Sequence, residues 1–328
     1  MTMSAEQTRF DWEASESAPE HYPMEIISGD LRYQGSPHGA GLYVPEGVLI
    51  YHGWGLTRSS HVTGDALKPL PDRLDITFYS YLEDQFYRGS FDLPYEKILH
   101  LFQEAEAAPK RKTMSGEDVP NNYVIIVGVA PGGTVAVWLR NQGTEELFFG
   151  KAEKVEVDFA KAFRIPIANR EERKGYVEET INDVVSPEML AAIRRNGIPF
   201  DKWTNYRIRY NWASTFFDRH MPSKIGISFY NGEGESFKFP LEKSYAATGH
   251  PVPSDVDFSY AINGQGTERY YVVRFDEDEI FDAFTRLSAM QLPMQLEFEP
   301  RFPIDQTLIR LHNGKESIPL KKYTVTRK

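Results

Sequence analysis

The stretch from Tyr123 to Leu139 reads YVIIVGVAPGGTVAVWL and is the clearest strand signal in the chain. Two runs rich in β-branched residues flank the turn Pro131-Gly132-Gly133. Such runs favour strands, whereas proline and glycine favour the turn between them. The sequence therefore predicts a β-hairpin, with strands over 123–129 and 134–139.

Four short stretches of the first half have similar counterparts in the second half, in the same order. The pairs are 10–12 with 210–212, 22–27 with 221–227, 74–78 with 256–260, and 95–102 with 277–284. Each match is weak alone, but the common order indicates two copies of one β-rich unit. A length of 328 residues suits two such units.

These matches divide the chain into four parts. We predict a disordered tail over 1–9, a first β-rich unit over 10–160, a helical connector over 161–205, and a second, degenerate unit over 206–328. Each unit is predicted to contain antiparallel strands and one helix. The predicted fold class is therefore α+β with strands dominant.

Several local patterns predict individual elements. Residues 25–35 and 41–51 are predicted strands. Pro94 is predicted as the first residue of a helix, because Ile98, Leu101, Phe102 and Ala105 follow at helical spacing. In the connector, Ser186-Pro187-Glu188 predicts the start of a helix that ends at Gly197.

Composition excludes several classes of protein. The net charge is −10, which argues against a nucleic-acid binder. There is no cysteine, so the chain has no disulfide, thiolate metal site, cysteine nucleophile or cysteine for lipid attachment. No run of about 18 apolar residues predicts a membrane span. Residues 1–9 are polar, which predicts a cytoplasmic protein, or a periplasmic one if an export segment and a lipid-accepting cysteine have been removed.

Candidate catalytic and metal motifs are better explained as structure. His38, His52 and His61 share a loop-rich region but match no metal spacing. The acidic run 276–279 suits the first turn of a helix rather than a calcium loop. No Gly-x-Ser-x-Gly elbow is present. We therefore predict no catalytic residue, no metal and no cofactor.

The first half resembles a bacterial family, the domain-of-unknown-function family 2931, over roughly Phe10 to Phe159. The resemblance rests on Gly53-Trp54-Gly55, Leu70-Pro71, Phe86-Tyr87, Val129-Ala130-Pro131-Gly132-Gly133 and Val137-Trp138-Leu139. The second half lacks this signature and has residues 301–305 in place of the Ala-Pro-Gly-Gly turn. Many members look like lipoproteins, and some resemble proteins found beside antibacterial effectors, including predicted lipases of type VI secretion. The resemblance implies an immunity protein that binds and blocks a toxin.

We predict that such binding uses the groove between the two units, or the loops over 53–60 and 109–120. Trp54 lies between two glycines in a polar loop with His52, Arg58 and His61. Two interpretations stand: an exposed indole that is an interface hot spot, or an indole folded back onto the core. A small-molecule or glycan-binding module is the alternative function, with a concave site that contains Trp54, Tyr79 and Tyr81. An unrecognised hydrolase is the third hypothesis.

Overall fold

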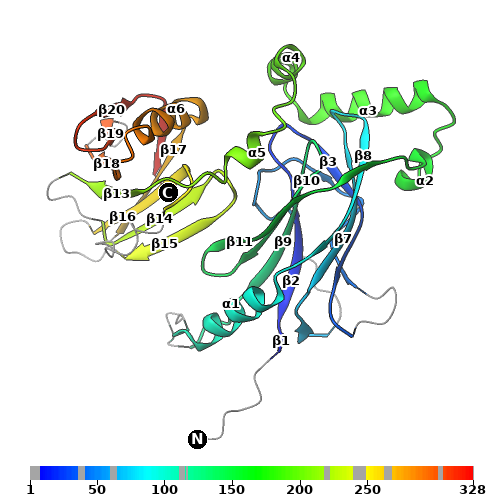
Figure 1. The fold of residues 1–328 in the computed structure, drawn as a ribbon, viewed down its shortest axis with the longest axis horizontal. Coiled ribbons are helices and arrows are strands. Elements are labelled where there is room, and N and C mark those ends of the chain that lie inside the picture. The colour runs from blue at the N-terminus through cyan, green and yellow to red at the C-terminus, as the bar shows by residue number, and fades with distance from the viewer. Residues whose placement is uncertain are drawn as a thin grey trace, which may run out of the picture. The chain divides into compact units, whose positions relative to one another are not determined.

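The computed structural model describes residues 8–35, 41–59, 65–110, 115, 117–217, 222–238, 249–261, 268–301 and 306–327. The chain forms two compact units, unit 1 over Met1–Phe200 and unit 2 over Asp201–Lys328. Most of the predicted tail, residues 1–7, lies outside the described residues, whereas Arg9 belongs to a strand. Strands dominate and helices are fewer, which confirms the predicted α+β class (Figure 1).

Unit 1 contains twelve strands and four helices within the described residues. The strands are β1 (Arg9–Phe10), β2 (Trp12–Ser17), β3 (Met24–Arg32), β4 (Leu42–Tyr43), β5 (Leu49–Ile50), β6 (Lys68–Pro69), β7 (Arg73–Ser80), β8 (Gln85–Asp92), β9 (Tyr123–Ala130), β10 (Thr134–Arg140), β11 (Thr144–Lys151) and β12 (Glu153–Val155). The helices are α1 (Tyr95–Ala107), α2 (Phe159–Phe163), α3 (Arg170–Val184) and α4 (Pro187–Asn196).

Two sheets of unit 1 enclose one hydrophobic core. In one sheet β2 pairs in parallel with β9, and β9, β10 and β11 continue as an antiparallel meander. The other sheet has the order β12-β8-β7-β3-β4, with β5 also paired to β3. Alternate residues of both sheets point inward, and α1 adds Ile98 and Phe102 to the same core. Because β9 is buried along its whole length, its outward face must also be covered.

The predicted hairpin is confirmed as β9 and β10, joined by the turn at residues 131–133. Gly133 has a φ of 75°, and a Cβ at this position would lie 2.3 Å from the carbonyl oxygen of Ala152. Ala152, the residue before β12, therefore has its backbone close to the turn. The Ala152 N–H donates to the Gly133 carbonyl at 2.7 Å. Glycine is required at position 133, because its φ is positive and because a Cβ would collide with the Ala152 carbonyl oxygen.

Some predicted boundaries are wrong. The predicted strand over 41–51 consists of the two short strands β4 and β5, because Pro45 and Gly47, whose φ is 69°, interrupt it. Pro94 precedes α1 as its N-cap rather than beginning it. The predicted start of α4 is confirmed, since the Ser186 side chain accepts a hydrogen bond from the Met189 N–H, and Gly197 follows its last turn with a φ of 82°.

Unit 2 contains nine strands and two helices within the described residues. They are α5 (Lys202–Asn205), β13 (Trp212–Phe216), β14 (Lys224–Phe229), β15 (Gly234–Lys238), β16 (Pro253–Ala261), β17 (Glu268–Phe275), α6 (Glu277–Ser288), β18 (Met294–Glu299), β19 (Leu308–His312), β20 (Ser317–Leu320) and β21 (Tyr323–Arg327). The acidic run 276–279 does begin a helix, with Asp276 as the N-cap of α6.

The pairing of strands in unit 2 follows the same order as in unit 1. β13 is parallel to β18, and β18, β19 and β20 form an antiparallel meander, as β2, β9, β10 and β11 do. β14, β16, β17 and β21 pair in sequence, as β3, β7, β8 and β12 do. The helix α6 precedes β18 as α1 precedes β9. That the two units descend from one repeated sequence stays a prediction.

Candidate functional site

The loop of residues 51–59, here called the Trp54 loop, covers the outward face of β9 and β10. The Trp54 ring meets the Trp138 ring edge-on, with centroids 4.8 Å apart and an angle of 86°. It packs on a small buried cluster formed by Val124, Ile126, Ala136 and Trp138. Trp54 itself is half-buried. The indole is therefore folded onto the sheet with part of its surface exposed, and its role in an interface stays a prediction.

Gly128 makes this packing possible. It lies on β9 beneath both indoles, and a Cβ there would approach the Trp138 ring to 2.4 Å and the Trp54 ring to 3.1 Å. Motifs that are about 80 residues apart in the sequence, Gly53-Trp54-Gly55 and Val137-Trp138-Leu139, thus converge at one place. These two motifs of the first half of the chain therefore contact each other over Gly128.

Hydrogen bonds with β2, with Ala18 just after it and with β10 attach the Trp54 loop to the sheet. They are Gly53 N–H to Ala18 O (3.0 Å), Ser17 Oγ to Gly53 O (2.8 Å), Arg58 N–H to Glu16 O (3.1 Å), and Arg140 Nη1 to Thr57 Oγ1 (2.8 Å). Both ends of the loop and its middle are thereby tied to the sheet. A loop held in this way loses little further conformational entropy when it binds.

The outward side of the loop combines an apolar side chain with polar ones. Leu56 is 59% exposed, and His52 and Arg58 are also exposed. The His52 ring stacks on Tyr51 with centroids 4.3 Å apart. Partial burial and the Arg58 charge lower the pKa of His52, which favours its neutral form. His61 lies outside the described residues.

A buried carboxylate anchors the end of the loop. Glu16 of β2 is fully buried, and the Ser59 hydroxyl donates to both of its carboxylate oxygens at 2.8 Å. The sequence shows this residue only as one acid within the short run Trp12–Ser17. Sequence reasoning missed both Glu16 and the exposed Leu56, because neither belongs to a recognisable motif.

Tyr79 and Tyr81 are not at the surface, which corrects their assignment to a concave binding site. Tyr79 is 0% exposed and Tyr81 is 2% exposed. Burial raises the pKa of both hydroxyls, which donate to the carboxylates of Asp84 and Glu25 respectively. Tyr79 belongs to the sheet opposite the one that Trp54 covers. The structure therefore does not bring the tyrosines together with the Trp54 loop.

The two tyrosines instead attach helices to the sheet. Tyr79 packs with Phe86 of β8 and with Phe159 and Phe163 of α2, whereas Tyr81 packs with Phe163. Arg173 of α3 lies over the Phe159 ring at 4.8 Å and donates from Nε to Asp84 at 2.9 Å. This aromatic cluster is structural, since its rings contact one another rather than open space.

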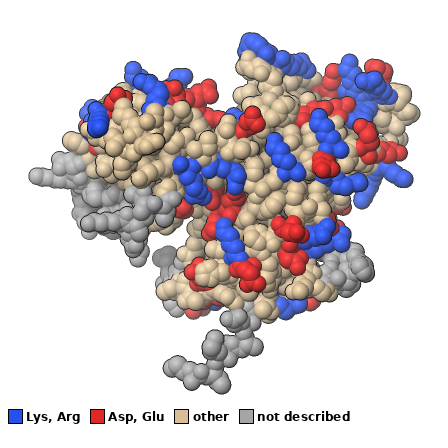
Figure 2. All heavy atoms as spheres, viewed as in Figure 1, with Lys and Arg blue, Asp and Glu red and all other residues tan. Residues whose placement is uncertain are grey.

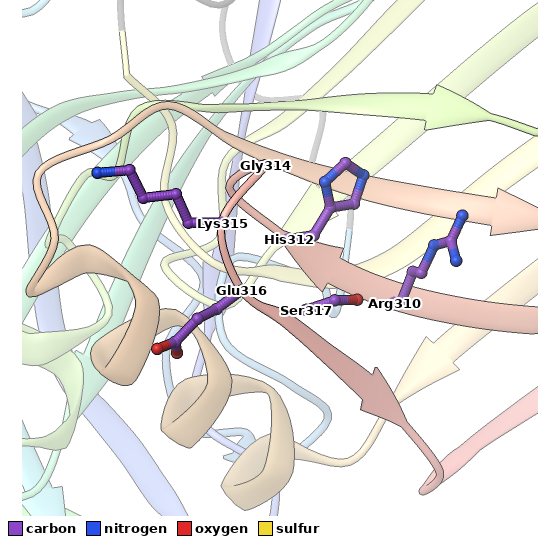
Figure 3. Close-up of a pocket in the computed structure, with 6 residues that line it drawn as sticks. All are labelled: Arg310, His312, Gly314, Lys315, Glu316 and Ser317. Carbon is purple, nitrogen blue, oxygen red and sulfur yellow. The ribbon is translucent and has the colours of Figure 1, made fainter.

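Unit 2 contains two neighbouring surface cavities. One of about 250 Å³ lies at the β19–β20 hairpin and is lined by Arg310, His312, Gly314, Lys315, Glu316 and Ser317. Figure 3 shows Arg310, His312 and Ser317 on one side of the hairpin, with Lys315 and Glu316 extending from its turn to the other side. A neighbouring cavity of about 420 Å³ shares Arg310 and Ser317 and extends over β18 to Glu297 and Glu299.

The face of the molecule drawn in Figure 2 carries charges of both signs. On the face visible in Figure 2, lysine and arginine side chains are interspersed with aspartate and glutamate. Across the part of the chain that the structure describes, no group of three or more histidine, aspartate or glutamate side chains is placed to hold a metal ion. None of its helices combines the length and apolar character that a membrane crossing requires.

Comparison with known proteins identifies one family. A family model described as "Protein of unknown function (DUF2931)" matches residues 1–201, which is more than half of the chain. Neither the curated proteins nor the solved structures contain a match. Trp54, Gly128 and Trp138 all lie within the matched residues.

Proposed function

This chain belongs to the family of proteins of unknown function termed DUF2931, and we propose that it is a non-enzymatic binding protein whose Trp54 loop contacts another protein. The observation that carries this proposal is the packing of Trp54 on Trp138 over Gly128. It brings together the two family-like motifs and fixes a loop that projects an exposed leucine.

The composition of the loop surface supports a protein partner. Leu56 is an exposed apolar side chain flanked by the exposed Arg58 and His52. Protein interfaces commonly have an apolar centre with a polar rim, and arginine is enriched in them. Trp54 holds the loop on the sheet, so the exposed side chains of Leu56 and Arg58 are the ones that contact the partner.

The preformed conformation supports specific binding. The hydrogen bonds to β2 and β10 order the loop before any partner arrives. Interfaces of ordinary size vary widely in affinity, and preorganisation is one of the factors that separates tight from weak binding. A rigid loop suits an inhibitor, which must occupy one site on its target.

The partner that we propose is a bacterial toxin, for example a lipase effector of type VI secretion. This part of the proposal rests on the resemblance of the first half to proteins found beside such effectors. The chain would act as an immunity protein that occludes the toxin active site by steric blocking. No catalytic group of the chain is involved in this mechanism.

A small-molecule or glycan-binding module is the second candidate. The cavity of about 420 Å³ in unit 2 favours it, because small-molecule sites occupy roughly 300–1,000 Å³. The burial of Tyr79 and Tyr81 weakens it, because these side chains do not line an open site.

Protection of bacteria tests the proposed function. The chain is co-expressed with the toxin encoded beside it, and survival is compared for wild type, Leu56→Asp and Leu67→Asp. Leu67 is also an exposed leucine, and it lies at the other end of β2, next to β6. We expect wild type and Leu67→Asp to protect and Leu56→Asp to fail. Equal protection by all three, or by none, would count against the Trp54 loop as the contact surface.

A further inference from the structure

The outward face of β18 and β19, here called the β18–β19 face, is only partly covered by the residues that the structure describes. Its exposed apolar side chains are Phe217, which is 47% exposed, and Leu308, which is 46% exposed. Between them lies Glu299, since β18 pairs with β19 at Glu299–Leu308. The cavity of about 420 Å³ lies on this face.

The strand registers identify which positions of the two units correspond. Trp12 is opposite Tyr123 in the parallel pair of unit 1, and Trp212 is opposite Met294 in that of unit 2. Counting from these pairs, Glu299 takes the position of Gly128. In the same way Glu297, opposite Arg310, takes the position of Ile126, opposite Trp138.

The chemistry of the face therefore changes at the place that Trp54 covers in unit 1. The apolar pair Ile126 and Trp138 is replaced by an ion pair between Glu297 and Arg310. The Arg310 guanidinium also lies 5.8 Å from the Phe217 ring centre. Its side chain keeps 45% of its surface exposed, so it can accept a further contact.

These groups suit an aromatic side chain with a polar hydrogen. A guanidinium attracts the face of an aromatic ring, most strongly that of tryptophan. The Glu299 carboxylate accepts from Arg301 through Oε1, and its Oε2 can accept the indole N–H. Leu308 and Pro319 line the same cavity and supply apolar contacts for the ring edges. We propose that the β18–β19 face docks a tryptophan side chain presented by a partner protein, in the position that Trp54 fills in unit 1.

The test uses N-acetyl-L-tryptophanamide as the probe on the full chain with labelled leucine and isoleucine methyl groups. NMR titration should shift the methyl signals of Leu308 and Ile309, with a dissociation constant on the order of millimolar. N-acetyl-L-leucinamide at the same concentrations should bind measurably more weakly, because it offers neither a π face nor a ring N–H.

Two variants test the assigned groups. Arg310→Lys keeps the charge opposite Glu297 but loses the planar group, and it should weaken the tryptophan probe about threefold. Leu308→Asp should abolish the shifts, and this exposed position is expected to tolerate the change. Leu67→Asp, at an exposed leucine of unit 1, should bind the probe as wild type does.

Three results would overturn the proposal: no shift up to the solubility limit of the probe, shifts away from β18–β20, or equal binding of the two amides. Unchanged binding by Arg310→Lys would overturn the assigned contact with the guanidinium. Because the probe is read on unit 2, each result is independent of whether the Trp54 loop binds a toxin.

Discussion

Trp54 packs edge-on against Trp138, with ring centroids 4.8 Å apart. Trp54 comes from a loop and Trp138 from the middle of β10, so one contact joins an irregular segment to the most regular part of unit 1. Edge-to-face aromatic pairs contribute about 0.5–1.5 kcal/mol beyond the area that they bury. The contact therefore covers the outward face of β10 and positions the residues that follow Trp54.

Gly128→Ala is predicted to disturb this pair. The new Cβ would meet the Trp138 ring at 2.4 Å and the Trp54 ring at 3.1 Å, so one or both indoles must move. We expect a loss of about 1–3 kcal/mol in the free energy of unfolding, measured by urea denaturation. The control is Gly175→Ala in α3, where nothing lies within 4 Å and alanine favours the helix. A Gly128→Ala protein as stable as wild type would contradict the described packing.

Gly133→Ala is predicted to be more damaging. Its φ of 75° is unfavourable for alanine, and the Cβ would lie 2.3 Å from a backbone oxygen that cannot easily move. Strain and overpacking together should cost about 2–4 kcal/mol. Gly197→Ala is the matched control, since its φ is 82° but its surroundings are open. If both variants lose the same stability by thermal or urea unfolding, the close approach of Ala152 is wrong.

Asp84→Asn is predicted to loosen α3. Asparagine tolerates the φ of 49° found at this position, so the change removes mainly the charge that pairs with Arg173. Because Asp84 is half exposed, we expect a loss of only about 1 kcal/mol. Asp65→Asn, at an exposed acid, should have no measurable effect. Hydrogen exchange of α3 amides should quicken in Asp84→Asn alone, and unchanged exchange there would contradict the prediction.

Glu25 is predicted to make the protein less stable as pH rises. Burial raises the pKa of Glu25 above 4.5, although the hydrogen bond from Tyr81 opposes this shift. The folded chain therefore holds a proton that the unfolded chain releases above pH 4.5, and this contribution is lost as pH passes through the raised pKa. Glu25→Gln should flatten the decline between pH 4.5 and neutral pH, as followed by urea unfolding. A steeper decline in the variant would reverse the sign and refute the assignment.

The sequence predicted the regular parts of the fold because their signals are local. The run from Tyr123 to Leu139 has β-branched residues around an obligatory turn, and α4 has a capping serine and a terminal glycine. The local pattern does not predict the long helix α3 as a separate element, because it contains few apolar residues and only Val177 and Ile181 are buried. Its position depends on Arg173 and the aromatic cluster, which are tertiary contacts.

The candidate site was predictable only in part. The two glycines beside Trp54 indicated a special loop, but whether the indole faced outward depended on Gly128 and Trp138, far along the chain. Tyr79 and Tyr81 were misassigned because their burial comes from α2, which no local pattern relates to β7. The β18–β19 face was not predicted, because its relation to the face under Trp54 appears only when the registers of the two units are compared.

The most direct test of the account is the affinity of the Trp54 loop for its partner. Wild type, Leu56→Asp and Leu67→Asp would each be titrated by calorimetry with the purified toxin that is proposed as the partner. We expect a one-to-one complex for wild type and Leu67→Asp, and an affinity at least about tenfold lower for Leu56→Asp, equivalent to about 1.4 kcal/mol. Absence of a complex with wild type, or an affinity that Leu56→Asp leaves unchanged, would contradict the assignment of this loop as the binding surface.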